Sequence, residues 1–321
     1  MSITLDHIVI LVSPSVLADL PAWLTSSFTV LDGGRHSNAI TENKLILFQD
    51  GVYIELIAFV QGTSPGKRAS TRWGKRNEGE AVDFALTLLQ SKRAGDGPFH
   101  LEDVFCSIIQ DRVRESQTAL EYSDPVAGGR VTPDGTELRW AISGPAWTTT
   151  SQSVEGELPF WCLDRTPRDL RVPFRSRPDV TNHACGAIGV RAVEMSIVGG
   201  EEDRGEKFRT VYTSFLGEGH AAEEKVAGHL FSKRYWELNV PARVMLSSAE
   251  NSASILTLQN AAQLVIASES SDAEGLSRIS LTLFTSGSPA VVSGEIAPGR
   301  VLEINLVKVS DLGKPLGLIS E

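Results

Sequence analysis

The chain has 321 residues, 41% of them hydrophobic, and a formal net charge of −10 at pH 7. This length and composition are typical of a packed globular protein of one large or two medium domains, which can bury a core without disulfide or metal support. The negative charge argues against nucleic acid and anionic membrane surfaces as partners, because both are polyanions.

The cysteines and the N-terminal segment indicate an intracellular protein. Cys106, Cys162 and Cys185 are odd in number and widely spaced, which fits a reducing compartment rather than a disulfide framework. The N-terminus lacks the shape of a signal peptide, and no segment approaches the ~20 apolar residues of a membrane-spanning helix. We therefore expect a cytoplasmic protein that does not cross a membrane.

The first part of the chain predicts the order β-α-β-β-β. Residues 3–12 are rich in β-branched side chains and predict a strand, and apolar residues recur at helical spacing from Val16 to Phe28. An Asp-Gly pair at 50–51 is a typical hairpin signal between two extended segments. The extended segments after the helix are residues 29–36, Lys44–Phe48 and Val52–Phe59.

A second and a third copy of this order are weaker. In the second copy, Ala81–Leu89 predicts the first strand and Leu101–Leu120 contains a helix. Its later strands are predicted at Gly128–Arg130, Gly135–Ile142 and Leu158–Leu163. In the third copy, a strand at Ala187–Val198 precedes a helix at Gly205–Leu216. Its later strands are predicted at Tyr235–Val240, Ser254–Leu258, Leu276–Phe284 and Arg300–Val309.

Two matches between copies support a repeat. His7 in the first strand falls opposite Glu194, and Glu55 falls opposite Glu303 at the same offset from a glycine. Repeats of this size are usually modules that pack against each other. We therefore predict an α+β fold of βαβββ modules. Residues 1–185 would hold two modules, at about 1–62 and 80–165, followed by a linker, and 186–321 an additional module of the same type.

Several ordered motifs resemble the glyoxalase-like branch of the vicinal-oxygen-chelate superfamily, which includes bleomycin resistance proteins and extradiol dioxygenases. The resemblance covers roughly residues 5–190. The motifs are LDHIVILV (5–12), GGRH (33–36), T-x-N (41–43), DGVYIELIAF (50–59), GGRVTPDGTELRW (128–140), LPF (158–160), DRTPRDLRVP (164–173) and HACGAIGV (183–190). The resemblance implies paired βαβββ modules whose curved mixed sheets form a half-open barrel around a ligand cavity.

The resemblance also implies a metal site. In metal-using relatives, a His and a Glu on the first and last strands hold a divalent ion that chelates two substrate oxygens, and His7 and Glu55 match these positions. A Glu within YIELIAF is costly to bury unless it is paired or bound to a metal. The second module offers no clear ligand, because Phe84, Phe160 and Trp161 stand near the corresponding positions. Whether an ion (Zn, Mn, Fe, Ni or Mg) is bound therefore stays open.

Other candidate site residues lie in the same motifs. His36 and Glu55 are candidate acid–base groups, because an imidazole titrates near neutral pH and a buried carboxylate can be tuned. Arg side chains suit carboxylate or phosphate oxygens, with salt bridges within the protein as the alternative. The candidate substrate-binding residues are Arg35, Asn43, Arg130, Trp140 and Arg165.

Two classes of function remain after these observations. The first is an enzyme, a lyase, isomerase or related type, that acts on a small oxygenated metabolite with or without a divalent metal. The second is a metal-free small-molecule binding or sequestration protein. A cofactor-free isomerase or cyclase that uses the same cavity is a further alternative. The sequence does not decide between a barrel completed within one chain and one completed in a homodimer. We expect the first two modules to share one cavity, away from Glu194 and Glu303.

Overall fold

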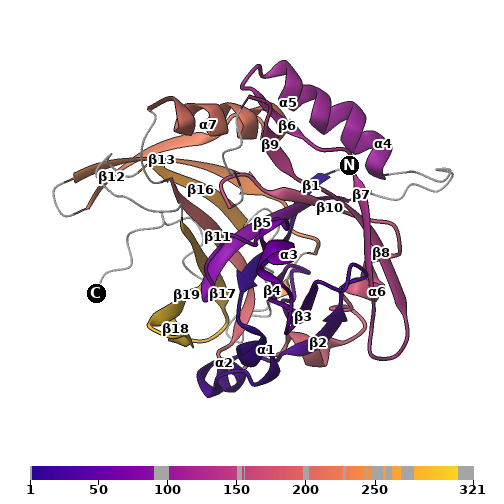
Figure 1. The fold of residues 1–321 in the computed structure, drawn as a ribbon. Coiled ribbons are helices and arrows are strands. Elements are labelled where there is room, and N and C mark those ends of the chain that lie inside the picture. The colour runs from indigo at the N-terminus through magenta and orange to yellow at the C-terminus, as the bar shows by residue number, and fades with distance from the viewer. Residues whose placement is uncertain are drawn as a thin grey trace, which may run out of the picture.

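The computed structural model describes residues 2–89, 101–149, 154, 156–197, 202–226, 229–242, 245–246, 256–257, 262–268 and 278–309. Its architecture is α+β, as predicted, with two curved mixed sheets that carry most of the chain (Figure 1). Among these residues, no helix is both long and apolar enough to span a membrane.

The first module begins at a strand whose side chains alternate between two apolar clusters. Ile8 and Ile10 of β1 enter the larger cluster outside the sheet, and Val9 and Leu11 enter a cluster on its inner face. A Ser at 13 caps α1 by accepting a hydrogen bond from the Val16 N–H. The elements are β1 (Ser2–Leu11), α1 (Pro14–Ala18), α2 (Ala22–Ser27), β2 (Leu31–Arg35), β3 (Thr41–Leu47) and β4 (Tyr53–Phe59).

The second module repeats this order with a longer helical segment. Its helices form one continuous run in which a π-helical stretch, η1, joins α4 and α5. The elements are α3 (Pro65–Ala69), β5 (Glu80–Leu89), α4 (Leu101–Val104), η1 (Phe105–Gln110), α5 (Asp111–Glu115), β6 (Leu120–Tyr122), β7 (Val126–Val131), β8 (Glu137–Ser143), β9 (Pro145–Trp147) and β10 (Phe160–Asp164).

The two modules form one eight-stranded sheet, called here the barrel sheet. Its order is β2-β3-β4-β1-β5-β10-β8-β7, with β1 and β5 antiparallel at the centre and each parallel to the last strand of its own module. At its outer strands, an isolated antiparallel bridge joins His36 to Arg130, and the Ser37 N–H donates to the Gly129 carbonyl at 2.8 Å. The sheet therefore nearly closes into a barrel, with a seam between β2 and β7.

Glycines permit the close approach at this seam. Gly34 has φ +127°, and a Cβ on it would lie 2.9 Å from the Val131 carbonyl oxygen. Gly129 faces a similar restriction, since a Cβ there would lie 2.6 Å from the Leu138 carbonyl oxygen. Both seam strands contain Gly-Gly-Arg, at 33–35 and 128–130.

The rest of the chain forms a seven-stranded second sheet of order β12-β13-β16-β11-β17-β19-β18. A connecting segment with α6 (Arg168–Arg171) and η2 (Pro178–Thr181) precedes it. Its elements are β11 (Ala187–Ile197), α7 (Glu202–Leu216), β12 (His220–Val226), β13 (His229–Leu238), β16 (Ala262–Ser268), β17 (Arg278–Thr285), β18 (Ala290–Ala297) and β19 (Arg300–Lys308). Met245–Leu246 (β14) and Leu256–Thr257 (β15) form a separate short pair.

The third copy contains a strand that the sequence did not predict. It is β16, which pairs with β11. Residues 254, 255 and 258 lie outside the described residues, and 256–257 belong to the short pair. The domain boundaries at 185 and 186 stay a prediction.

The two sheets share the larger apolar cluster. Trp161 of β10 packs edge-on against Phe215 of α7, with ring centroids 5.6 Å apart. A polar contact adds to this packing: the buried Asp50 carboxylate accepts hydrogen bonds from the Val52 and Val190 N–H groups at 2.9 and 2.8 Å. These contacts attach the outer face of the barrel sheet to the second sheet.

Candidate active site

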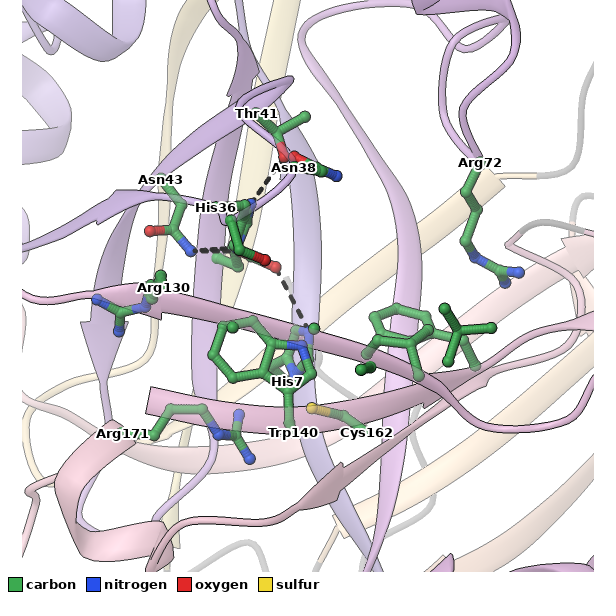
Figure 2. Close-up of a pocket in the computed structure, with 18 of the residues that line it drawn as sticks. His7, His36, Asn38, Thr41, Asn43, Arg72, Arg130, Trp140, Cys162 and Arg171 are labelled. Atoms are coloured by element: carbon green, nitrogen blue, oxygen red, sulfur yellow. Dashed lines mark hydrogen bonds and ion pairs between the residues drawn. The ribbon is translucent and has the colours of Figure 1, made fainter. Parts of the chain in front are cut away.

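The inside of the barrel sheet holds a cavity of about 470 Å³. Strands of both N-terminal modules line it, together with the turn after β2 and the loop after α3. Figure 2 shows polar side chains grouped on one side, with aromatic rings beside them. The polar group consists of His7, His36, Asn43, Glu55 and Arg130, and the rings are Tyr53, Trp73, Trp140 and Phe160.

His7 lies on β1 between two carboxylates. A β-bulge at Asp6 interrupts the pairing with β5, which lets two consecutive side chains approach each other. His7 Nδ1 is 3.5 Å from Asp6 Oδ1, and Nε2 is 3.4 Å from Glu55 Oε2. Tyr53 stacks on the ring with centroids 4.6 Å apart. Burial favours a lower pKa for His7, but the two carboxylates outweigh it and raise the pKa above its usual value.

Asp6 is fully buried and held by two arginines of α6. Arg171 Nη2 donates to Oδ2 at 2.8 Å, and Arg168 Nη1 donates to Oδ1 at 2.9 Å. Burial acts to raise the pKa of Asp6, yet the arginines and His7 keep it well below its usual range. The connecting segment therefore supplies the guanidinium groups that keep Asp6 ionised beside His7.

Glu55 on β4 lies between the two imidazoles. It accepts a hydrogen bond from Asn43 Nδ2 at 2.5 Å, and His36 Nε2 lies 3.6 Å from its Oε1. Burial acts to raise the pKa of Glu55, but the hydrogen bond and charge of His7, helped by His36 and Asn43, lower it to about 2. The carboxylate is therefore favoured in its ionised form, and its acid–base role stays a prediction.

His36 follows β2 and is held by Thr41 at the start of β3. Its Nδ1 is 2.7 Å from Thr41 Oγ1, and its backbone N–H donates to the Thr41 carbonyl at 2.9 Å. The edge of Trp140 lies against the ring, with centroids 5.9 Å apart. Burial lowers the pKa of His36 more than the Glu55 charge raises it. The cavity thus contains one imidazole favoured in its protonated form and one favoured as the neutral base.

The structure brings most of the predicted site residues together. His7, His36, Asn43, Glu55, Arg130 and Trp140 all line the cavity. Arg35 and Arg165 instead line a neighbouring cavity of about 420 Å³, where they pair with Glu42 at 3.6 Å and Glu102 at 2.5 Å. Glu194 pairs with Lys233 at 2.7 Å in the second sheet, and neither it nor Glu303 lines the cavity.

Sequence reasoning missed several contributors. Asp6 and Tyr53 were not singled out, although an Asp-His pair within an apolar strand and a Tyr two residues before Glu55 are both visible signals. Arg171 was noticed only as part of an arginine-rich motif. Arg72 and Trp73 on the loop after α3 carried no signal, because only the fold brings that loop to the cavity, where Asp83 accepts hydrogen bonds from both.

The described side chains are not arranged as a metal centre. His7 Nε2 and His36 Nε2 lie 3.4 and 3.6 Å from different oxygens of Glu55. Within the described ranges, no group of three or more His, Cys, Asp and Glu side chains is arranged to hold an ion. The His7 and Glu55 metal-ligand role stays a prediction, and no step below uses a metal.

The second module explains why a symmetric ligand set is missing. Ala85 pairs with Phe160 as His7 pairs with Tyr53, so the counterparts of His7 and Glu55 are Ala85 and Cys162. The sequence placed these positions one residue earlier, because the bulges that shift the register are set by strand pairing. Burial raises the pKa of the Cys162 thiol well above its usual range, which favours a protonated thiol over a thiolate ligand.

Comparisons with known proteins agree with this fold. The family model for the glyoxalase-like domain matches residues 5–203. A hypothetical protein from Staphylococcus aureus superimposes with a TM-score of 0.58 at 13% identity, over 95% of this chain and 100% of that chain. This likeness concerns the fold alone. None of the curated proteins matches the sequence significantly.

Two further solved structures are less similar. A mutant of 4-hydroxymandelate synthase from Streptomyces coelicolor has a TM-score of 0.48 at 11% identity, over 89% of this chain and 72% of that chain. Glyoxalase I from Zea mays has a TM-score of 0.29 at 12% identity, over 97% of this chain and 94% of that chain. Similarities this low carry no argument about function.

Proposed function

Because this chain belongs to the glyoxalase-like domain family, whose model spans residues 5–203, we propose that it is an enzyme acting on a small oxygenated metabolite in the barrel cavity. The reaction is a proton transfer of the isomerase or lyase type. One observation carries the proposal: a buried carboxylate joins two imidazoles whose pKa values are shifted in opposite directions. Titratable groups pushed apart in this way are typical of an acid and a base that work together.

His36 is the base in this proposal. Its pKa is lowered by burial, so the ring is neutral near pH 7, and Thr41 fixes the ring through Nδ1. The Nε2 atom takes a proton from a carbon next to a substrate carbonyl. Glu55 stays ionised and stabilises the imidazolium that forms 3.6 Å away.

His7 is the acid. Asp6 and Glu55 favour its protonated form, so it can stabilise negative charge that develops on a substrate oxygen. Asn43 holds Glu55 in register with both rings through its 2.5 Å hydrogen bond. Trp140 and Phe160 supply apolar walls that limit water around the reacting atoms.

Proton exchange in D₂O tests this proposal. Purified protein is incubated with a panel of small 2-oxo and 2-hydroxycarbonyl compounds, and loss of the C–H signal is followed by proton NMR. We expect exchange with at least one compound, and a loss of about 100-fold or more in His36→Asn. His220→Asn is the matched control, because His220 is exposed on the second sheet. Exchange that survives His36→Asn would refute the role of His36.

A binding or sequestration protein is the second candidate. The observation that favours it is that His7 and Asn43 already pair with the Glu55 carboxylate. Side chains that are paired in this way can line a cavity that binds a ligand without reacting with it. This candidate predicts ligand binding with no exchange in any compound. It also predicts that His36→Asn changes affinity without changing any reaction rate.

A further inference from the structure

Arg130 on β7 is a buried cation without a carboxylate partner. The residue is 6% exposed and lines the cavity, and its Nη1 donates to the Gly33 carbonyl. No Asp or Glu of the described residues forms an ion pair with it, and burial lowers its pKa. A charge buried without a counter-ion is destabilising, so Arg130 differs from an ordinary structural arginine.

Arg130 differs from the other arginines around the two cavities in having no carboxylate partner among the described residues. Arginines on the same walls are neutralised by carboxylates within 4 Å. These pairs are Arg35 with Glu42, Arg72 with Asp83, Arg139 with Glu137, Arg165 with Glu102, and Arg171 with Asp6 and Asp164. Arg130 is therefore the lining arginine of the described residues that is left to bind a charge from outside the protein.

The barrel seam places Arg130 next to His36. The two residues face each other in the isolated antiparallel bridge that links β2 to β7. Side chains directly opposite in such a pair point to the same face, about 5 Å apart at Cβ. Figure 2 shows Arg130 on the side of the cavity occupied by Asn43 and His36. A group bound to Arg130 thus lies beside the base.

We infer that the substrate carries an oxyanion group, a carboxylate or a phosphate, which Arg130 binds in the cavity beside His36. A guanidinium suits these groups because its N–H donors match their oxygens in pairs. The guanidinium attracts the anionic end of the substrate, so that end lies beside Arg130. This inference deepens the proposed function and rests on it for the identity of the reaction.

For a 2-substituted carboxylic acid, the chemistry is balanced without a further reactant. The C–H bond next to the carboxylate breaks, the proton moves to His36 Nε2, and the electron pair enters the enolate oxygens that Arg130 faces. Return of the proton to the opposite face of the same carbon inverts that centre and gives the stereoisomer. Departure of a leaving group from the next carbon gives an elimination. No electrons are gained or lost overall.

Matched ligand pairs test the charge requirement on the unaltered protein. Isothermal titration in a buffer without carboxylate or phosphate compares each small 2-oxo or 2-hydroxy acid with its methyl ester, and separately with a phosphate-bearing analogue. We expect at least one anion to bind and its neutral partner to bind much more weakly. The acid and phosphate arms identify which oxyanion is preferred. Equal binding of acids and esters, or no anion binding at all, would overturn the inference.

Variants assign the effect to Arg130. We expect Arg130→Gln to weaken anion binding about 10- to 100-fold, Arg130→Lys to restore part of it, and Arg139→Gln to leave it unchanged, since Arg139 is exposed and paired with Glu137. Unchanged anion affinity in a folded Arg130→Gln protein would overturn the inference.

The two proposals can fail separately. Binding of anions to His36→Asn together with loss of C–H exchange supports both. Anion binding with no exchange in the unaltered protein keeps the anion site and removes the proposed reaction. Exchange on neutral compounds that persists in Arg130→Gln keeps the reaction and removes the anion site.

Discussion

The barrel sheet and the second sheet share the arrangement of their four central strands but differ in their outer strands. Each has an antiparallel central pair, β1–β5 or β11–β17, flanked by a parallel strand on either side. In the barrel sheet, the outer strands meet at the His36–Arg130 bridge and a cavity forms. Among the described residues, the outer strands β12 and β18 of the second sheet do not pair with each other.

The charged residues differ in the same way. Glu55 is buried between two imidazoles, whereas Glu194 is half-buried and neutralised by Lys233 at 2.7 Å. Glu303, which the sequence matched with Glu55, lies exposed on β19. A repeated topology therefore gives a site only where the sheet closes, because closure makes inward side chains of opposite strands face each other.

The largest expected effect is a loss of stability when Asp6 is replaced in the charged network of the barrel sheet. Asp6→Asn leaves two buried guanidinium groups poorly compensated and removes the negative partner of His7. We expect a loss of roughly 3–5 kcal/mol in the free energy of unfolding, measured by urea denaturation. Glu194→Gln is the control in the second sheet, with an expected change within about 1 kcal/mol. Equal losses in both variants would remove the special status of the barrel network.

Glu55→Gln should abolish the coupling between the two histidines. We expect C–H exchange to fall about 100-fold, because neither imidazole keeps its carboxylate partner. The pKa of His7 should also fall, since Glu55 is one of the two groups that raise it. Exchange kinetics and proton NMR give the two readouts, with Glu303→Gln as control. A rate above one tenth of the unaltered protein would contradict the account.

Gly34→Ala tests whether ligand binding requires closure of the barrel sheet at the seam between β2 and β7. A Cβ at Gly34 would lie 2.9 Å from the Val131 carbonyl oxygen, and φ +127° strains any residue with a side chain. We expect a loss of about 1–3 kcal/mol in stability together with weaker ligand binding, since the His36–Arg130 bridge lies beside it. Gly66→Ala, where a Cβ meets open space, is the control. Normal binding in Gly34→Ala would show that closure is not required.

The smallest expected effect is a change in the pH dependence of stability at Asp50, which links the two sheets. Burial raises the pKa of Asp50 to about 7 from its ordinary 3.8. The folded state then binds more protons than the unfolded state between these values, so this group's contribution to stability falls as pH rises from about 4 to about 7 and is constant above. Asp50→Asn should flatten that part of the stability profile. An unchanged slope would show that Asp50 is ionised when folded.

Much of the site was predictable, because a single charged residue within an apolar strand must find a partner when buried. The family resemblance pointed to His7 and Glu55, and the burial argument predicted that Glu55 has a partner. It could not identify Asp6 or the counterparts Ala85 and Cys162, because β-bulges shift the register and depend on the partner strand.

The third copy was harder to place. The sequence predicted a strand at Ser254–Leu258 but none at Ala262–Ser268, which pairs with β11. A buried parallel strand carries no alternation to distinguish it from neighbouring apolar segments. The sequence could not predict that Arg130 lacks a carboxylate partner. Acidic residues lie near it in the sequence, and only the fold shows that none of the described ones pairs with it.

The opposite protonation of His7 and His36 is the central claim, and NMR titration of their ring nitrogens tests it most directly. With signals assigned through His36→Asn, the account predicts that His7 titrates above 6.5 and His36 below it. The pKa values of the two rings would then be shifted in opposite directions from the ordinary imidazole value. Titration of both rings together near 6.5, or in the reverse order, would contradict the account.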